Sequence, residues 1–227
     1  MKSNADGPAV GLVPAAGRGV RLGESRPKAF VELGGVPMLR LAVDGLTASG
    51  AVDAVIVMVP NEMLDATRAL LPRPVTVVAG GAERVDSVRA GLAAASDAEY
   101  VLVHDAARPF TPPELISRVV AELRAGHSAV VPALPLSDTV KVVDQRGAVV
   151  ETPDRARLRA IQTPQGFRAD LLKRAYREMN HLQVTDDAGL VEAAGAAVHT
   201  VPGDPLAFKI TNPLDLELAR TLSRVRR

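Results

Sequence analysis

The stretch Val10-Gly-Leu-Val-Pro-Ala-Ala-Gly-Arg-Gly-Val-Arg-Leu-Gly-Glu-Ser-Arg-Pro-Lys28 decides the fold, because a short apolar strand runs directly into a glycine-rich turn. The turn carries glycines at positions 17, 19 and 23 and basic residues at positions 18, 21 and 28. Glycines let backbone N–H groups approach a phosphate closely, and the basic side chains would neutralise its charge. The spacing is neither the dinucleotide fingerprint Gly-x-Gly-x-x-Gly nor a Walker loop ending in Gly-Lys-Ser/Thr. It favours a cradle for a triphosphate over an ordinary turn.

Short β-branched runs alternate with amphipathic segments along the chain. The predicted strands are Val10–Val13, Ala54–Val59, Val75–Val78, Tyr100–His104 and Ala129–Pro132. The predicted helices are Met38–Ala48, Met63–Leu71, Arg84–Ala95 and Pro113–Ala125, the last with a capping box over Thr111–Glu114. Buried runs of this kind are typical of a parallel sheet covered by helices on both faces. We therefore predict an α/β fold in which a single domain, residues 1–227, contains a doubly wound, mostly parallel sheet.

Three loops rich in polar and small residues each follow a predicted strand. They span residues 17–28, 80–87 and 105–109. Because the carboxyl ends of parallel strands meet at one edge of a sheet, we expect these loops to form a single site. Side-chain alternation places Asp105 on the same face of its strand as Val103, with His104 on the opposite face. We expect His104 to be a packed core residue rather than a catalytic base.

The segment from Ser137 to Arg159 interrupts the alternation of strands and helices. Its runs Asp138–Val143 and Ala148–Glu151 alternate like the two strands of a hairpin. An isolated hairpin cannot bury both of its faces, so this protruding β-hairpin arm needs a surface on its own domain or on a second chain. Beyond the arm we expect helices Arg168–Met179 and Asp186–Ala194, a strand Val198–Val201, and a closing helix with Asn212 as N-cap and Pro213 in its first turn.

Composition limits the class of protein. The 227 residues suffice for one large core, and no apolar run approaches the ~18 residues that span a bilayer. The polar start Met1–Gly7 lacks the apolar core of a signal peptide, and the chain has no cysteine for disulfides or thiolate metal sites. A net charge of +1 and 3% aromatic residues argue against a nucleic-acid surface. We expect a cytoplasmic enzyme with neither a membrane nor a nucleic-acid partner.

Some enzyme classes are disfavoured by what the sequence lacks. The histidines at positions 104, 127, 181 and 199 have no metal-ligand spacing, and no Gly-x-Ser-x-Gly nucleophile motif occurs. Metalloprotease and serine-hydrolase chemistry therefore have no candidate residues.

Five segments follow one another in a distinctive order. They are Val13–Lys28, Gly80–Ser87, Val101–Pro109, Thr163–Gln165 and Lys209–Thr211. Together they resemble the family of 2-C-methyl-D-erythritol 4-phosphate cytidylyltransferases, over about residues 9 to 220. The resemblance implies a Rossmann-like nucleotidyltransferase fold. It also implies transfer of CMP from CTP to 2-C-methyl-D-erythritol 4-phosphate, by in-line attack of the acceptor phosphate on the α-phosphate with release of pyrophosphate.

The resemblance also implies roles for individual residues. Arg21, Lys28 and Lys209 would be the catalytic cations. Nucleotide contacts would come from Pro14, Ala15, Ala16, Gly17, Gly81, Ala82, Ser87 and Asp105. Contacts to the acceptor would come from Asp105, Arg108, Thr139, Arg155, Thr163 and Thr185. Asp105 would also bind Mg²⁺ or another divalent cation.

Several of these residues have a plain structural alternative. Asp105 could cap a helix or pair with Arg108 instead of binding a metal. Arg84, at the start of its predicted helix, is equally compatible with the site and with solvent. The family often has Asp where this chain has Ala82, which leaves a backbone contact at that position. The pattern Thr-x-Asp-Arg at 152–155 favours Arg155 over its neighbours Arg157 and Arg159 as the residue that faces the site.

In the resembled family the hairpin interlocks with a second subunit and lends residues to its site. The resemblance therefore implies a homodimer with residues 137–159 as the dimerisation arm.

Three other functions stay open. Another polyol phosphate, such as ribitol 5-phosphate, could be the acceptor. Molybdopterin and sugar-1-phosphate nucleotidyltransferases share only the first loop. The presence of Lys28, Asp105 and Lys209 together disfavours a non-catalytic nucleotide-binding module.

Overall fold

The computed structural model describes residues 7–17, 27–178 and 184–225, and these residues form an eight-stranded central sheet. Its strands are β1 (Ala9–Pro14), β4 (Ala54–Val59), β5 (Val75–Ala79), β6 (Tyr100–Val103), β7 (Ala129–Pro135), β10 (Arg159–Ile161), β11 (Gln165–Arg168) and β12 (His199–Pro202). Strands β5, β4, β1 and β6 are parallel neighbours, and Leu12 of β1 pairs with Ile56 on one side and Val103 on the other. The predicted α/β class with a mostly parallel sheet is confirmed.

Strand β11 runs antiparallel between β6 and β7. It is absent from the predicted set, because four residues that include a glycine carry no strand periodicity. Helix α4 packs closely on Gly166, since a Cβ atom there would be 2.6 Å from Val119 and 2.8 Å from Leu123. The next residue, Phe167, is fully buried on the opposite face. Packing on both faces therefore explains why this short segment forms a strand.

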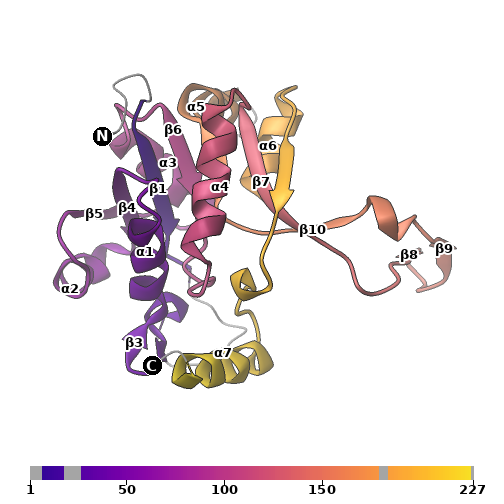
Figure 1. The fold of residues 1–227 in the computed structure, drawn as a ribbon, viewed down its shortest axis with the longest axis horizontal. Helices are drawn as coiled ribbons and strands as arrows, with labels where there is room; N and C mark the ends of the chain where they lie inside the picture. The colour runs from indigo at the N-terminus through magenta and orange to yellow at the C-terminus, as the bar shows by residue number, and fades with distance from the viewer. Residues whose placement is uncertain (1–6, 18–26, 179–183, 226–227) are drawn as a thin grey trace.

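Helices cover both faces of the sheet (Figure 1). The described residues form helices α1 (Met38–Ala48), α2 (Leu64–Leu70), α3 (Arg84–Ala94), α4 (Pro113–Arg124), α5 (Ala169–Glu178), α6 (Asp187–Ala193) and α7 (Pro213–Val225), of which α7 lies beside the sheet rather than on a face. One core layer joins the buried faces of α1 and α4 to the sheet, and a second joins α3, α5 and α6 to the other face. Leu102 belongs to the first layer and Val103 to the second, as the alternation in the sequence predicts.

A third apolar cluster fastens the last part of the chain beside the main sheet. It joins α7 to the small β2–β3 hairpin, whose strands are Glu32–Leu33 and Val36–Pro37, and it includes Leu33, Phe110 and Ile210. The backbone N–H of Ile210 also donates to the carbonyl of Ala107 at 2.9 Å. Because Ile210 is fully buried, the neighbouring Lys209 has a fixed place near the end of β6.

The starts of two helices test the capping predictions. Asn212 accepts a hydrogen bond from the backbone N–H of Asp215 at 2.9 Å, which confirms it as the N-cap of α7. The capping box over Thr111–Glu114 is wrong. Helix α4 begins after Pro112, and the Thr111 hydroxyl instead donates to a carbonyl of its own turn at 3.0 Å. The proline moves the helix start one residue beyond the threonine.

The segment 137–159 leaves the sheet as an arm that projects away from the body (Figure 1). Its hairpin is shorter than predicted, since β8 is Val142–Val143 and β9 is Val149–Glu151. The valines of this hairpin, at positions 142, 143, 149 and 150, are 42% to 61% exposed. In this chain the hairpin therefore does not pack on its own domain.

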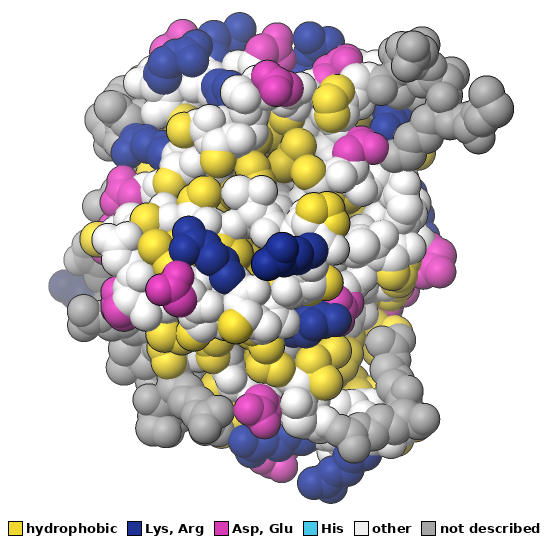
Figure 2. Space-filling view, turned by 90° about the vertical axis from the view of Figure 1, so that its left-hand side faces the viewer, with side chains coloured by type: hydrophobic (Ala, Val, Ile, Leu, Met, Phe, Trp, Pro, Cys, Tyr) yellow, Lys and Arg dark blue, Asp and Glu magenta, His cyan; other side chains and the backbone are white. Residues whose placement is uncertain are grey.

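The face that carries α2 and β5 shows how charge is distributed on the surface. On this face basic and acidic side chains are interspersed among apolar ones (Figure 2). Its described residues therefore do not form the broad basic surface that nucleic acids require. No helix among the described residues is long and apolar enough to cross a membrane.

Phe167 offers a direct test of the core beneath β11. We expect Phe167→Ala to lower the free energy of unfolding by about 3–5 kcal/mol, because it opens a cavity between the sheet and its second helix layer. Phe167→Leu keeps most of the apolar volume and should cost about 1 kcal/mol. Urea titrations at one fixed protein concentration measure both values. A loss below about 1 kcal/mol in Phe167→Ala would show that β11 is not part of the core.

Candidate active site

Two adjoining cavities open at the edge of the sheet where β1, β5 and β6 end. The first, of about 390 Å³, is lined by Pro14, Ala15, Ala16, Gly17, Lys28, Ala29, Ala82, Glu83, Arg84, Ser87, Asp105, Ala106, Ala107 and Lys209. The second, of about 320 Å³, is lined by Arg84, Asp105, Arg108, Ile161, Gln162, Thr163, Gln165, Thr185, Asp186 and Lys209. Arg84, Asp105 and Lys209 line both cavities and form the wall between them. The loops after three strands thus meet at one edge, as predicted.

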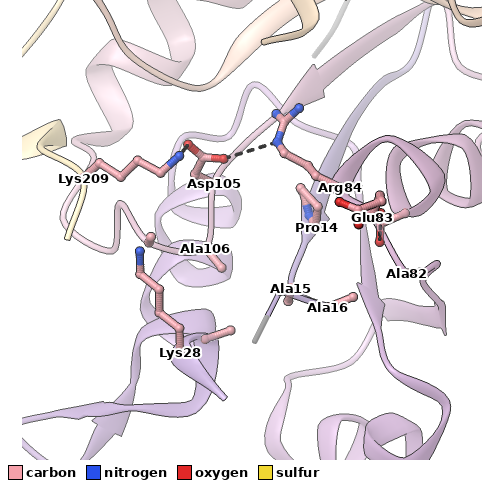
Figure 3. A pocket seen from close by; sticks show the side chains of 14 residues that line it. Pro14, Ala15, Ala16, Lys28, Ala82, Glu83, Arg84, Asp105, Ala106 and Lys209 are labelled. Atoms are coloured by element: carbon pink, nitrogen blue, oxygen red, sulfur yellow. Dashed lines mark hydrogen bonds and ion pairs between the residues drawn. The ribbon is translucent and has the colours of Figure 1, made fainter. Parts of the chain in front are cut away.

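The residues that follow β1 form one side of the first cavity. The backbone N–H of Ala15 donates to the carbonyl of Met58 at 2.8 Å, which continues the strand pairing up to the cavity. Alanine side chains leave the space beside this backbone open. The ammonium groups of Lys28 and Lys209 lie across the cavity from Ala82 (Figure 3). The predicted catalytic cation Arg21 lies outside the described residues.

The loop before α3 needs its two glycines for close packing. A Cβ atom on Gly81 would lie 2.2 Å from the Cβ of Asp86, and one on Gly80 would lie 2.8 Å from the Ser87 hydroxyl. The Ser87 hydroxyl accepts from the N–H of Gly81 and donates to the carbonyl of Glu83, both at 3.2 Å. Ser87 is buried and borders the first cavity, so the loop and the start of α3 form one compact wall.

Asp105 is surrounded by three cations. Its carboxylate lies 2.9 Å from Lys209 Nζ, 3.6 Å from Arg108 Nε and 3.7 Å from Arg84 Nε. Burial alone would raise the pKa of Asp105, but the charges of Lys209 and Arg84 outweigh it and lower the pKa to about 2. The Asp105 backbone N–H donates to the Thr163 hydroxyl at 3.0 Å. The carboxylate is therefore ionised, and it stands at a fixed point between the two cavities.

His104 is fully buried beneath this group, as the sequence predicts. Its Nδ1 lies 3.1 Å from the Thr163 hydroxyl, and its Nε2 has no hydrogen-bond partner among the described residues. Burial lowers the pKa of His104 to about 4, against the opposing effect of the Asp105 charge. The imidazole is thus neutral near pH 7 and lies in the core rather than in a cavity.

Arg108 combines the two interpretations that the sequence leaves open. It is an ion-pair partner of Asp105, and it also lines the second cavity. Its guanidinium donates to the carbonyls of Ala207 at 2.6 Å and Ile161 at 3.4 Å, which fixes its orientation. The other two acceptor residues predicted in the body of the protein, Thr163 and Thr185, line the same cavity.

Thr139 and Arg155 are not brought to these two cavities within one chain. Both line a third cavity of about 650 Å³ on the arm, and none of its lining residues borders the other two. Arg155 donates to the carbonyl of Ser137. Arg159 also lines the arm cavity, whereas Arg157 does not. A single chain therefore separates the predicted acceptor residues into two groups.

The structure also adds residues that the sequence alone leaves unassigned. Arg84 lies in the shared wall and forms an ion pair of 2.6 Å with Asp187, which is 103 residues away. Glu83 caps α3 and borders the first cavity. The side chain of Asp186 accepts from Gln165 Nε2 at 2.7 Å, and both residues line the second cavity. The acidic pair Asp186 and Asp187 directly after Thr185 is visible in the sequence, but the sequence does not indicate which side chains the two carboxylates contact.

The donor set of the site determines what kind of metal it could hold. Among the described residues, no group of three or more His, Cys, Asp or Glu side chains is placed to bind a metal. Asp105 alone offers a carboxylate in the wall that both cavities share. Mg²⁺ in phosphate-transfer sites takes one or two carboxylates together with substrate phosphates and waters. The single carboxylate, which pairs with Lys209, Arg108 and Arg84, could therefore hold such a cation only together with phosphate oxygens and waters.

Comparison with known proteins gives one consistent result. A family model described as 2-C-methyl-D-erythritol 4-phosphate cytidylyltransferase matches residues 9–224. A protein of that name from Nocardia farcinica (strain IFM 10152) is 69% identical over 219 residues, covering 96% of this chain and 94% of the relative. One from Rhodococcus jostii (strain RHA1) is 66% identical over 216 residues, covering 95% of each.

Solved structures agree in fold as well as sequence. The crystal structure of a 2-C-methyl-D-erythritol 4-phosphate cytidylyltransferase from Thermus thermophilus is 38% identical with a TM-score of 0.78, and covers 96% of this chain and 99% of that one. That of a 4-diphosphocytidyl-2C-methyl-D-erythritol synthase from Anaerococcus prevotii DSM 20548 is 30% identical with a TM-score of 0.84, covering 97% and 99%.

The buried imidazole predicts a pH-dependent stability. The pKa of His104 is about 4 in the folded protein and 6.5 when exposed, so below pH 6.5 only the unfolded chain gains a proton there. This stabilising contribution is complete above pH 6.5 and is lost as the pH falls toward 4. Between about pH 7 and pH 5 the free energy of unfolding should fall by roughly 2 kcal/mol more in the wild type than in His104→Asn. Urea titrations in EDTA measure this difference. Identical pH dependence in both proteins would contradict a neutral, buried imidazole.

Proposed function

The chain belongs to the family of 2-C-methyl-D-erythritol 4-phosphate cytidylyltransferases, and on this basis we propose how its two cavities carry out the reaction. The protein transfers CMP from CTP to 2-C-methyl-D-erythritol 4-phosphate, which releases pyrophosphate and forms 4-diphosphocytidyl-2-C-methyl-D-erythritol. The observation that supports the proposal is the shared wall of Arg84, Asp105 and Lys209. Two substrates in adjoining cavities would meet at this wall with their phosphates in contact.

We assign CTP to the first cavity. Its triphosphate would lie against the backbone of residues 14–17 and the ammonium groups of Lys28 and Lys209, together with Arg21. The cytosine would contact the backbone of Gly81 and Ala82 and the hydroxyl of Ser87. Ala82 and Ser87 line the first cavity, which supports this assignment, whereas Gly81 packs on Asp86 and is not among the lining residues.

We assign the acceptor to the second cavity. The hydroxyls of Thr163 and Thr185 suit a polyol, and the Arg108 guanidinium suits its anionic phosphate. Asp105 borders this cavity as well, so the acceptor phosphate would approach the α-phosphorus beside the carboxylate and its cations.

The reaction requires little proton chemistry. The acceptor phosphate is largely dianionic near neutral pH, since the second pKa of a phosphate ester is about 6. One of its oxygens forms a bond to the α-phosphorus, while the bond to the bridging oxygen breaks and pyrophosphate leaves with that electron pair. Catalysis then consists of aligning two anions and neutralising their charge, for which Lys28 and Lys209 are the proposed groups. A neutral His104 in the core is compatible with a mechanism that has no general base.

We propose Asp105 as the protein ligand of a divalent cation such as Mg²⁺. Its low pKa keeps the carboxylate ionised at neutral pH, and phosphate oxygens would complete the coordination. Such a cation would neutralise charge on the triphosphate when bound.

We further propose a cytoplasmic homodimer in which the arm of one subunit completes the acceptor site of the other. Three observations support the dimer. The arm projects from its own domain, its valines are exposed, and its proposed acceptor residues Thr139 and Arg155 lie away from the second cavity. A second copy of the chain would bury the apolar hairpin and bring both side chains to an acceptor.

Pyrophosphate release tests the function. With CTP and Mg²⁺, we expect rapid release in the presence of 2-C-methyl-D-erythritol 4-phosphate and little release with ribitol 5-phosphate. Lys28→Ala and Lys209→Ala should each lower turnover about a hundredfold or more, because each removes a cation that faces charge developing in the transition state. Thermal unfolding of both variants controls for the fold. Faster turnover of ribitol 5-phosphate would overturn the acceptor, and near-wild-type rates in either variant would overturn that lysine's role.

Mixed dimers test the shared acceptor site. Lys28→Ala and Arg155→Ala chains should each be inactive alone. In a mixed dimer one site would carry both defects and the other neither, so equal mixing should restore about a quarter of wild-type activity after subunit exchange. Mass spectrometry of differently tagged chains verifies the exchange. Verified mixed dimers without recovered activity, or a monomer by light scattering, would rule out the shared site.

A further inference from the structure

The wall between the two cavities contains Arg84, whose guanidinium is hydrogen-bonded to a carboxylate that lines neither cavity. Arg84 is the first residue of α3, and its side chain borders both cavities. Figure 3 shows its guanidinium beside Asp105, on the side opposite Lys209. The distance from Arg84 Nε to the Asp105 carboxylate is 3.7 Å, which is an ion pair but too long for a hydrogen bond. Asp105 therefore does not fix this guanidinium.

The group that fixes Arg84 is Asp187, at the start of α6. Arg84 Nη2 donates to one Asp187 oxygen at 2.6 Å, and the Tyr176 hydroxyl of α5 donates to the other at 2.5 Å. Asp187 is 1% exposed, so both of its oxygens are occupied by donors away from water. Burial and the Asp187 charge raise the pKa of the Tyr176 hydroxyl, which keeps it protonated as a donor. Three helices thus contribute to one hydrogen-bonded chain that ends at the shared wall.

We propose that Asp187 is a positioning residue that holds Arg84 between the two cavities, and that the Tyr176 hydroxyl orients the Asp187 carboxylate for this task. The inference rests on the proposed function, because it assigns Arg84 to the place where the acceptor phosphate meets the α-phosphate of CTP. There the guanidinium contacts both phosphates and is a further catalytic cation of the reaction. Asp187 and Tyr176 touch neither substrate and act through Arg84.

Electrostatics explain why the arginine needs a second carboxylate. A free arginine beside Asp105 would form a close bidentate pair with it, which would neutralise the carboxylate and turn the N–H groups away from the substrates. The shorter bond to Asp187 holds the guanidinium at 3.7 Å from Asp105 instead. The remaining N–H groups stay available to phosphate oxygens in a fixed orientation, so less side-chain entropy is lost when substrate binds.

The test is a double-mutant cycle on steady-state kinetics with CTP and 2-C-methyl-D-erythritol 4-phosphate. We expect Arg84→Ala to lower kcat about a hundredfold and Asp187→Asn about tenfold, with KM for both substrates nearly unchanged. If Asp187 acts through Arg84, adding Asp187→Asn to Arg84→Ala changes kcat no further. Multiplicative losses in the double variant would overturn the proposal, because a purely structural carboxylate acts independently of the arginine.

Tyr176→Phe supplies a milder variant that leaves both charges in place. It should lower kcat several-fold, while the affinity for CTP measured by calorimetry stays unchanged. An unchanged kcat would overturn the proposed chain from Tyr176 through Asp187 to Arg84, even if Arg84→Ala does not fold. The matched control is Tyr100→Phe, which alters the chain's other tyrosine. Tyr100 lies at the start of β6, whereas Asp105 follows the end of that strand, so the control should leave kcat unchanged. Wild-type protein that releases no pyrophosphate with this acceptor would instead refute the proposed function.

Discussion

The arrangement of the site depends on the Asp105 carboxylate, which holds three basic side chains close together. A site that binds two polyanionic phosphates needs several basic side chains close together. These side chains repel one another while no phosphate is bound. Asp105 offsets this repulsion, because Lys209, Arg108 and Arg84 lie 2.9, 3.6 and 3.7 Å from it. When a phosphate binds, its oxygens can replace the Asp105 carboxylate as the ion-pair partners of these basic side chains. The backbone N–H of Asp105 donates to the Thr163 hydroxyl at the end of β6, which holds the backbone of Asp105 in place.

The rest of the fold holds the partners of Asp105 around it. Lys209 is fixed by the burial of Ile210 in the α7 cluster, whereas Arg108 is fixed by two backbone carbonyls. Lys28 lies in the segment just before the β2–β3 hairpin. That hairpin packs in the same apolar cluster as Ile210. Elements from both ends of the chain therefore meet where the parallel strands end. This is why the two cavities lie at the carboxyl edge of the sheet rather than on either helical face.

The sequence predicts those parts of the structure that local patterns determine. Strands β1, β4 and β6 are largely apolar runs in the sequence, and the loops after β1 and β6 lie at the strand ends, so the positions of Ala15 and Asp105 beside the first cavity follow from the sequence. Strand β11 was not predictable, because Phe167 pairs with Val101 of β6 and Ala129 of β7, both far along the chain. The bond from Arg84 to Asp187 was missed for the same reason. Ion pairs between helices on one face of a sheet leave no periodic signal in either helix.

The shared wall has a consequence for the design of ligands. Cavities of about 390 Å³ and 320 Å³ that differ in chemistry meet at only three side chains among the described residues. A molecule that joins a cytidine-like part to a polyol phosphate by a short anionic linker would occupy both at once. Its second part would bind from a high effective concentration, so the affinities of two weak fragments would combine without new contacts. Because the linker would replace the reacting phosphates, such a compound would be held by the same cations that we propose for catalysis.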